Sequence, residues 1–434
     1  MSASVFMDAY ILMRGQLPFD FYFYYLIYAL VVFKYIKKNK DLKLLPKWFF
    51  ITLVAIIAVS YATGINYNTS GFTMHKQVIG IVFSSVSFYC YLKLVDFQIW
   101  SLTKTYLYLS LIVATLGIFE EVFHLIGIHL TPIKGTNLMF YRVYSILGEP
   151  YFLAVILLPA FHFYLSHLFQ KNMVKTMKSL IRFSIIFVCL IFTFSAAGYM
   201  GMSVSLILLL YEKGFFSFKK GRIFLLPLLL LAVLTITLNS KDKIENIKIR
   251  FTDTYEAFTT KNLNFEFVKT LNSSTFALYT NYIIADGSFR RNPISGSGLG
   301  SHILNYDRTF EDFFSEEFLI TFGEFNKQDA NSLFLRLMSE LGLFGLILFF
   351  VFLMKNFILR KWTSIPELLP IVIINHGIFV MIVIRLLRTG NYIGNGFFFF
   401  FFLYWATSKT VKNYKKHNKT LTLNGHEPKL KDPV

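Results

Sequence analysis

Repeated long apolar segments are the feature that most constrains how this 434-residue chain can fold. A helix that crosses a bilayer needs roughly 20 mostly apolar residues, and eleven segments come close to that description. Hydrophobic residues make up 55% of the sequence, which exceeds the share of an ordinary soluble domain. The segments lie near residues 19–36, 48–63, 78–95, 104–128, 150–170, 180–197, 199–212, 222–240, 333–354, 366–386 and 397–408.

We therefore predict an all-α polytopic membrane protein with about 11 transmembrane helices. The first residues, MSASVFMDAYILMRG, lack the basic region of a cleavable signal peptide, and Asp8 interrupts their short apolar run. We expect them to form an interfacial helix, with a twelfth span as the alternative.

The short loops between these segments differ in positive charge. Taken alternately, the loops at 34–47, 93–104, 171–182, 213–222 and 355–361, with the tail, hold 26 Lys and Arg, whereas the other short loops hold 6. Because short loops rich in Lys and Arg stay in the cytoplasm, the first set is predicted to be cytoplasmic. Loop charge thus explains the net charge of +18, and nucleic acid is not expected as a partner.

One connection is far longer than the others and falls on the external side. It spans residues 241–330 and carries 13 acidic and 10 basic residues, and such length is typical of functional loops. Within it, residues 262–285 have apolar side chains near helical spacing, which favours an amphipathic helix. The predicted order is transmembrane helices 1–8 in residues 1–240, the large external loop with short helices in 241–330, helices 9–11 in 331–408 and a basic cytoplasmic tail in 409–434.

The stretch PISGSGLGSH, residues 293–302, raises the question of a phosphate-binding loop. Its spacing is GxGxG with no following Lys-Ser/Thr, and the topology places it outside, so a nucleotide site is excluded. Two interpretations remain: the glycines let the backbone turn or approach another segment closely, or bare N–H groups face an anion. We expect a hinge that brings the preceding arginines over an anionic lipid headgroup.

Arginines recur at the external ends of several segments. Arginine near bilayer depth is costly and usually pairs or binds a ligand, and its planar fork suits phosphate. We therefore predict a site for a lipid phosphate or diphosphate, although Arg385 alone is also explained by snorkelling and Arg142 by pairing with Glu149. The predicted phosphate-binding residues are Arg142, Arg290, Arg291, Arg385 and Arg388.

Other local patterns have structural interpretations. Arg336 and Glu340 are four residues apart and are predicted to pair along one helix. The run FFFFFF at 397–402 is predicted to face lipid. No local spacing predicts a metal site: Cys90 and Cys189 lie within apolar runs, and the histidines have no carboxylate partner at ligand spacing. We expect no metal.

A series of short motifs resembles the O-antigen and capsular polysaccharide polymerases (Wzy-type), which share a superfamily with the O-antigen ligases. In chain order they are R-x5-G-E-P from Arg142, FSAAGYMG at an external turn, a basic pair followed by GSGLG, NSLFLRLMSELGLFGL at 331–346 and RTGNY at 388–392. Their order and sidedness over residues 140–405 carry the resemblance, because each motif alone is weak.

The resemblance implies a bacterial inner-membrane glycosyltransferase whose active face is periplasmic. It implies that a growing glycan on undecaprenyl diphosphate is transferred to an incoming repeat unit on the same lipid, without metal or other cofactor. The expected partners are these lipid-linked donor and acceptor glycans and the lipid bilayer, together with a chain-length regulator protein.

The chemistry needs an acceptor for the proton of the attacking hydroxyl. The external candidates are Glu149, His302 and Asp329. In the ligases a histidine commonly precedes the Asn of the N-S motif, but here that position is Ala330, which leaves the base open. Further candidate substrate-binding residues, taken from the external motifs, are Ser195, Tyr199, Asn331 and Tyr392.

Two alternatives remain open from the sequence. The first is an O-antigen ligase, which differs only in its acceptor. The second is a lipid-linked oligosaccharide flippase, a transporter class in which repeated halves are common. We find no internal repeat, which favours the enzyme.

Overall fold

The computed structural model describes residues 1–7, 10–13, 21–39, 43–63, 71–128, 142–169, 173–214, 252, 255–256, 259, 273–313, 326–394 and 396–423. Within them the chain is almost entirely helical, with one short antiparallel pair, β1 (Ile11–Met13) and β2 (Phe21–Tyr22). The helices are η1 (Ser2–Phe6), α1 (Phe23–Lys38), α2 (Lys47–Ala62), α3 (Gly71–Leu94), α4 (Ile99–Leu125), α5 (Pro150–Leu168), α6 (Met173–Phe192), α7 (Ala196–Lys213), α11 (Ser273–Arg291), α12 (His302–Phe313), α14 (Leu333–Asn356), η4 (Arg360–Ser364), α15 (Leu369–Arg388) and α16 (Phe397–Leu423).

Several helices are long and apolar enough to cross a membrane. Five in the described part of the chain meet this criterion, namely α3, α4, α5, the stretch that begins with α14, and α15, while α2 is a shorter apolar helix. The protein is therefore a multi-pass α-helical membrane protein. The segment predicted near 222–240 lies outside the described residues, as does the first part of the helix predicted over 262–285.

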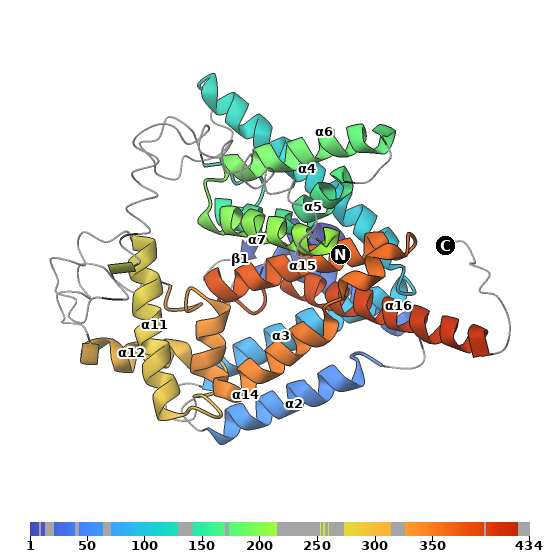
Figure 1. Cartoon of the computed structure of the whole chain (residues 1–434). Helices are drawn as coiled ribbons and strands as arrows, with labels where there is room; N and C mark the ends of the chain where they lie inside the picture. The colour runs from blue at the N-terminus through green and yellow to red at the C-terminus, as the bar shows by residue number, and fades with distance from the viewer. Residues whose placement is uncertain are drawn as a thin grey trace.

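Helix α5 forms the centre of the bundle. Its residues from Leu153 to Ser166 are all buried, because α15, α6 and α7 pack around it (Figure 1). A helix that is apolar on every side needs apolar neighbours all round, and here other helices of the protein supply them. Pro150 opens the helix at the position where its missing N–H costs nothing.

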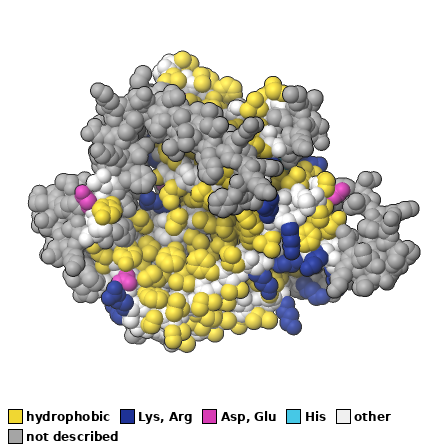
Figure 2. All heavy atoms as spheres, in the orientation of Figure 1, with side chains coloured by type: hydrophobic (Ala, Val, Ile, Leu, Met, Phe, Trp, Pro, Cys, Tyr) yellow, Lys and Arg dark blue, Asp and Glu magenta, His cyan; other side chains and the backbone are white. Residues whose placement is uncertain are grey.

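The connections sort to two ends of the bundle. At one end lie the loop before α5, the turn between α6 and α7, and the loop after α15. At the other, Arg360 donates to the Glu212 carbonyl and Lys412 to the Lys355 carbonyl. Most of the Lys and Arg that Figure 2 shows lie toward this second end, near the C-terminal part of α16. We call the first end the outer end and the second the basic end.

The phenylalanine run is buried, so the prediction that it faces lipid is wrong. The six side chains of residues 397–402 are at most 8% exposed. They open α16 and pack against aromatic residues of α2, α3, α4 and α14, as in the stacked pair Phe352 and Phe401. Hydropathy shows that a segment is apolar. It does not show whether lipid or other helices will surround that segment, because both provide apolar contacts.

Helix α14 is broken at Gly342, whose backbone has the non-helical angles φ 58° and ψ −151°. In a regular helix the N–H groups of Leu343 and Phe344 would bond to the carbonyls of Ser339 and Glu340. Here those two N–H groups donate instead to the carbonyls of Pro293 and Ile294, at 2.8 and 2.9 Å.

The glycine loop fills the break from the other side. The N–H groups of Ser297 and Gly298 donate to the freed carbonyls of Ser339 and Glu340, at 3.1 and 2.7 Å. Four backbone bonds thus replace the two that the helix loses, and residues 296–300 are buried. These two amides are not free for an anion. The loop is a fixed clamp on α14 rather than the expected hinge, whereas the alternative of close backbone approach is confirmed.

Candidate active site at the outer end

Three chain segments build the outer end of the bundle: the start of α5, the residues that lead into α14, and the end of α15 with its following loop. Ser332 caps α14 by accepting from the Leu335 N–H, and its hydroxyl donates to the Leu386 carbonyl at 2.6 Å. One serine therefore starts α14 and fixes it against the end of α15.

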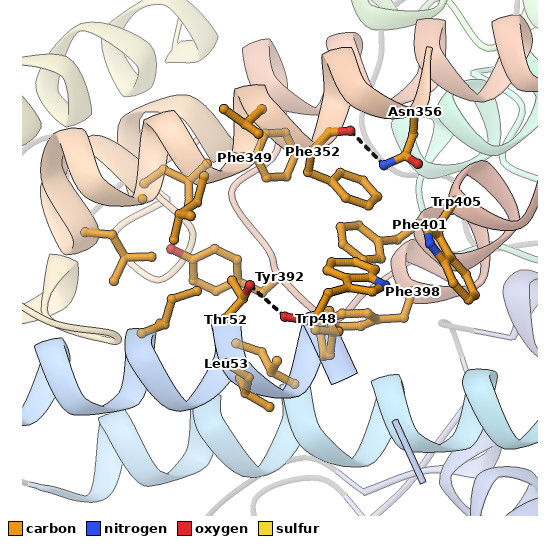
Figure 3. Close-up of a pocket in the computed structure, with 18 of the residues that line it drawn as sticks. Trp48, Thr52, Leu53, Phe349, Phe352, Asn356, Tyr392, Phe398, Phe401 and Trp405 are labelled. Atoms are coloured by element: carbon orange, nitrogen blue, oxygen red, sulfur yellow. Dashed lines mark hydrogen bonds between the residues drawn. The ribbon is translucent and has the colours of Figure 1, made fainter. Parts of the chain in front are cut away.

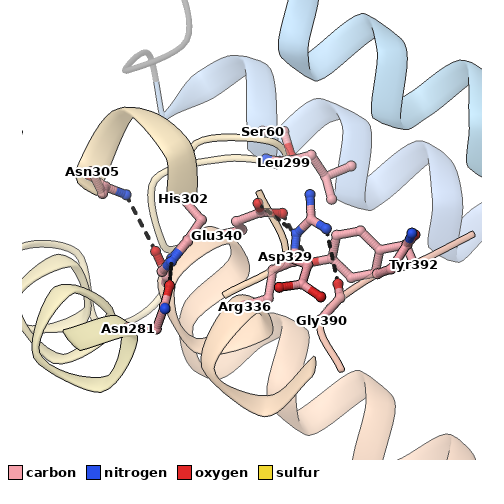
Figure 4. Close-up of polar contacts among 12 residues, drawn as sticks. Ser60, Asn281, Leu299, His302, Asn305, Asp329, Arg336, Glu340, Gly390 and Tyr392 are labelled. Carbon is pink, nitrogen blue, oxygen red and sulfur yellow. Dashed lines mark hydrogen bonds and ion pairs between the residues drawn. The ribbon is translucent and has the colours of Figure 1, made fainter. Parts of the chain in front are cut away.

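A buried ion pair between Arg336 and Glu340 begins one turn farther along α14 (Figure 4). Arg336 Nε donates to Glu340 Oε1 at 3.0 Å, as the i,i+4 spacing predicted, and both side chains are almost fully buried. Arg336 Nη1 donates to the Gly390 carbonyl at 3.0 Å, and the Tyr392 hydroxyl donates to Glu340 Oε2 at 3.0 Å. Burial and the Glu340 charge raise the pKa of Tyr392 well above its usual value. Through its contacts with Gly390 and Tyr392, the ion pair holds the loop after α15 on α14.

Asp329 lies in the tight turn before α14, next to that loop. Its Oδ1 accepts from the Asn331 N–H at 3.0 Å. Burial raises the pKa of Asp329, against the opposing effects of that N–H, of Arg336 and Arg385, and of the Gly390 N–H. Gly390 has no room for a side chain, because a Cβ would overlap the Asp329 carbonyl oxygen. The turn therefore holds a carboxylate with raised pKa among cationic groups.

The end of α15 supplies two arginines. Arg385 is 1% exposed, donates to the Asn391 carbonyl at 2.9 Å and lies over the Phe397 ring. Arg385, Arg388, Asp329 and Glu149 all act electrostatically on the phenol of Tyr151 in the first turn of α5. The fold thus gathers five groups from three segments around one place, of which Tyr151 alone was missed from the sequence.

Among the residues that the structure describes, several buried polar atoms of these same segments have no hydrogen-bond partner. They include Tyr151 Oη, Asn331 Nδ2, Thr389 Oγ1 and Arg336 Nη2. Buried polar atoms are nearly always paired with protein groups or with bound molecules, so several of them in the segments that meet at this end indicate a site that accommodates a polar ligand. Asn331 was predicted as a substrate-binding residue from its motif, whereas no sequence spacing connects Tyr151 and Thr389 to it, which explains why these two were missed.

His302 lies at the start of α12 and is completely buried. Its Nε2 is 2.9 Å from Asn281 Oδ1 of α11, a contact in which the histidine donates. Burial and the nearby charge of Arg336 lower the pKa of His302 to about 3. In this arrangement the imidazole is neutral and joins α12 to α11.

Arg142 and its neighbours lie at the outer ends of α6 and α7. The arginine is partly exposed and close enough to Tyr199 to act on its phenol electrostatically. The Tyr199 hydroxyl donates to the Ile191 carbonyl at 3.0 Å, and Ser195 is buried at the start of α7. These residues belong to the same end of the bundle as Asp329.

Arg290 and Arg291 end α11, which lies across the outer end of the bundle beside α12 (Figure 1). Both are exposed. Arg290 pairs with Asp286 of its own helix at 2.8 Å, and Arg291 donates to Thr309 of α12 at 2.8 Å. Their contacts within the described residues are with α11 and α12, not with the Arg385 group.

An apolar cavity of about 380 Å³ lies beside the site, between α2, α14 and α16 (Figure 3). Tyr392 and Leu333 line it near the outer end, and Lys355 and Lys412 line it near the basic end. Its walls are otherwise mostly aromatic and aliphatic. The cavity therefore extends along α14 from the loop that carries Tyr392 toward the positively charged end.

Part of the chain is similar to a known protein family. Residues 181–350 match the family model described as O-antigen ligase (Wzy_C), and no curated protein matches the chain. The matched part includes the turn with Ser195 and Tyr199, α11, the glycine clamp, Asp329 and the Arg336–Glu340 pair. Residues 181–350 are thus similar to the O-antigen ligase family, which is consistent with the O-antigen ligase/polymerase superfamily.

Proposed function

We propose that the protein polymerises glycan repeat units at the periplasmic face of a bacterial inner membrane. The growing glycan leaves undecaprenyl diphosphate and is transferred to a hydroxyl of the next lipid-linked repeat unit. The observation that carries the proposal is the cluster of Arg385, Arg388, Tyr151 and Asp329 next to an apolar cavity, within a chain whose central part matches the O-antigen ligase family. A charged head and a long apolar tail are the two parts of a lipid diphosphate.

In the proposed reaction one bond forms and one bond breaks. The acceptor oxygen attacks the anomeric carbon of the donor, the bond from that carbon to the diphosphate oxygen breaks, and the lipid diphosphate leaves. Negative charge grows on the departing oxygen, and fixed donors aimed at it lower the barrier. We assign this role to Arg385 and Arg388, with Arg142 as a further cationic contact.

We assign to Asp329 the role of the general base, which accepts the proton of the acceptor hydroxyl. Among the three candidates it combines a raised pKa, which makes it a better base than an ordinary carboxylate, with a place beside the arginines. Glu149 is exposed at the rim and is assigned to acceptor binding. The buried contact of His302 with Asn281 suits a positioning role for α12.

The remaining residues are assigned to the glycan and the lipid. Asn331, Tyr199 and Ser195 contact sugar hydroxyls, whereas Tyr392 separates the polar cluster from the cavity. The cavity holds part of the polyprenyl chain. Arg290 and Arg291, on the exposed end of α11, contact the glycan farther from the reacting bond.

The surface glycan of a deletion strain tests the proposal. Without a polymerase, each acceptor carries one repeat unit, so we expect single capped units in place of a ladder of lengths on gel electrophoresis. The ligase alternative, which the family description favours equally, predicts full-length polymer retained on undecaprenyl diphosphate. An unchanged surface glycan would contradict both assignments.

Replacing Tyr151 by phenylalanine separates a substrate contact from a structural role. The hydroxyl has no hydrogen-bond partner among the described residues, so its loss should leave the thermal stability unchanged or slightly higher. If it donates to the diphosphate, the transfer rate should fall by roughly 10–100-fold, the range for a hydrogen bond to a charged group. The measurement is the initial rate of polymer formation in membranes that contain equal amounts of protein.

The matched control is Tyr404→Phe, which removes a buried hydroxyl that donates to the Leu353 carbonyl at 2.8 Å, away from the outer end. That variant should lose stability and keep its rate per folded molecule. If Tyr151→Phe and the wild type had equal transfer rates, the assignment of Tyr151 as a substrate contact would be wrong.

A further inference from the structure

Three polar side chains meet inside the bundle near its basic end, far along the helices from the proposed active site. They are His162 of α5, Glu212 of α7 and His376 of α15, exposed by 0%, 4% and 0%. His162 Nε2 is 2.9 Å from Glu212 Oε1, and His376 Nδ1 is 2.6 Å from the same oxygen. Their sequence separations exclude any local motif.

The hydrogen bond made by His376 Nε2 determines what must lie between His376 Nδ1 and Glu212 Oε1. His376 Nε2 is 2.7 Å from the Ile358 carbonyl oxygen, which only accepts, so Nε2 carries a hydrogen. In a neutral imidazole, Nδ1 then presents a lone pair to a carboxylate oxygen. Two acceptors repel at this separation. A positive charge, either a proton or a metal ion, must therefore lie between them.

The surroundings of the cluster match those of a metal site. Metal-binding histidines usually donate their second ring N–H to a carbonyl or carboxylate, as His376 does to Ile358. The carboxylate is oriented by Ser166, whose hydroxyl donates to Glu212 Oε2 at 2.8 Å. Two imidazoles and one carboxylate are the ligand set of many zinc sites, and all three ligand atoms lie within 4.8 Å of one another.

We propose that His162, Glu212 and His376 bind a divalent transition metal ion, with Zn²⁺ the best match to two nitrogens and one oxygen. Tetrahedral zinc separates its ligand atoms by roughly 3.3 Å, given bonds of about 2.0 Å. Binding therefore moves Glu212 Oε1 slightly farther from the two histidine nitrogens, which now lie 2.9 and 2.6 Å from it. The site joins α5, α7 and α15, two of which carry Tyr151 and Arg385 at their opposite ends, so its role is to fix the bundle rather than to touch substrate.

Metal content is the direct test. The full chain, carrying an affinity tag without histidine, is purified in detergent after growth with zinc and analysed by inductively coupled plasma mass spectrometry. We expect about one zinc per chain, because the three ligands form one site. Glu212→Gln and His376→Gln should lose it, whereas His167→Gln, a nearby histidine of α5 outside the cluster, should keep it.

Cobalt substitution and thermal melting give readouts that do not depend on the variants. Co²⁺ should produce visible absorption bands of a four-coordinate site, and removal of zinc by a chelator should lower the melting temperature by roughly 2–5 °C, restored by added Zn²⁺. Wild-type protein without metal, without Co²⁺ bands and indifferent to chelator would overturn the proposal and leave a protonated His–Glu pair. Neither readout involves glycan transfer, so the result is independent of the proposed function.

Discussion

Arg385→Ala should abolish glycan polymer formation while the protein remains in the membrane. Arg385 is the most deeply buried of the arginines assigned to the diphosphate, and its charge acts at the same place as those of Arg388 and Asp329. Removing one preorganised donor from a developing negative charge costs roughly 10²–10³-fold in rate. Arg385→Lys should also be impaired, because lysine cannot form two parallel bonds with a phosphate.

The measurement is the length distribution of surface glycan, together with the initial rate in membranes of equal protein content. Arg308→Ala is the matched control, because Arg308 is exposed on α12 at the outer side and has no assigned role. It should behave as the wild type. Because Arg385 also donates to the Asn391 carbonyl, size-exclusion in detergent must show that the variant is folded. If folded Arg385→Ala still made polymer of wild-type length, Arg385 would not bind the diphosphate as proposed.

Gly296→Ala should destabilise the protein more than a Gly→Ala substitution at any other position of the glycine loop. A Cβ at this position would overlap backbone atoms of Glu340 and Leu341, and the residue has φ +63°, which side chains rarely adopt. The clamp then loses its contact with α14, and the carbonyls and N–H groups at the Gly342 break lose their partners. We expect a cost of at least about 3 kcal/mol, which combines backbone strain with unpaired buried polar groups.

Gly127→Ala separates the two causes. Gly127 has φ +83°, but nothing lies within 4 Å of its Cβ position, so only backbone strain applies and the cost should be about 1 kcal/mol. Thermal unfolding of both variants in the same detergent makes the comparison. If Gly296→Ala melts no lower than Gly127→Ala, the loop does not clamp the helix.

The clamp also positions the helix that borders the proposed active site. Residues 293–298 fix α14 at its break, within two turns of Arg336 and Glu340, and Leu299 of the same loop donates its N–H to the Ser60 hydroxyl of α2 at 3.1 Å. A loop that resembles a phosphate-binding motif therefore contributes by holding α14 against α2. The proposed diphosphate contacts come from α5 and α15 instead.

The sequence by itself determined the features that depend on neighbours along the chain. Apolar length predicted the membrane helices, several of which the structure contains, and the i,i+4 spacing of Arg336 and Glu340 predicted their ion pair. Motif order predicted a resemblance to the O-antigen ligase/polymerase superfamily, and the match over residues 181–350 is consistent with that prediction. These signals are local, because hydropathy and helical periodicity are properties of consecutive residues.

Only the tertiary structure decided which distant groups meet. It brought Tyr151 of α5 to Arg385 of α15 and buried the phenylalanine run against other helices. It also turned the glycine loop into a clamp on α14. The physical reason is that an apolar helix surface is satisfied by lipid or by protein, so composition does not specify a partner. Shape and backbone hydrogen bonding between segments far apart in the chain make that choice.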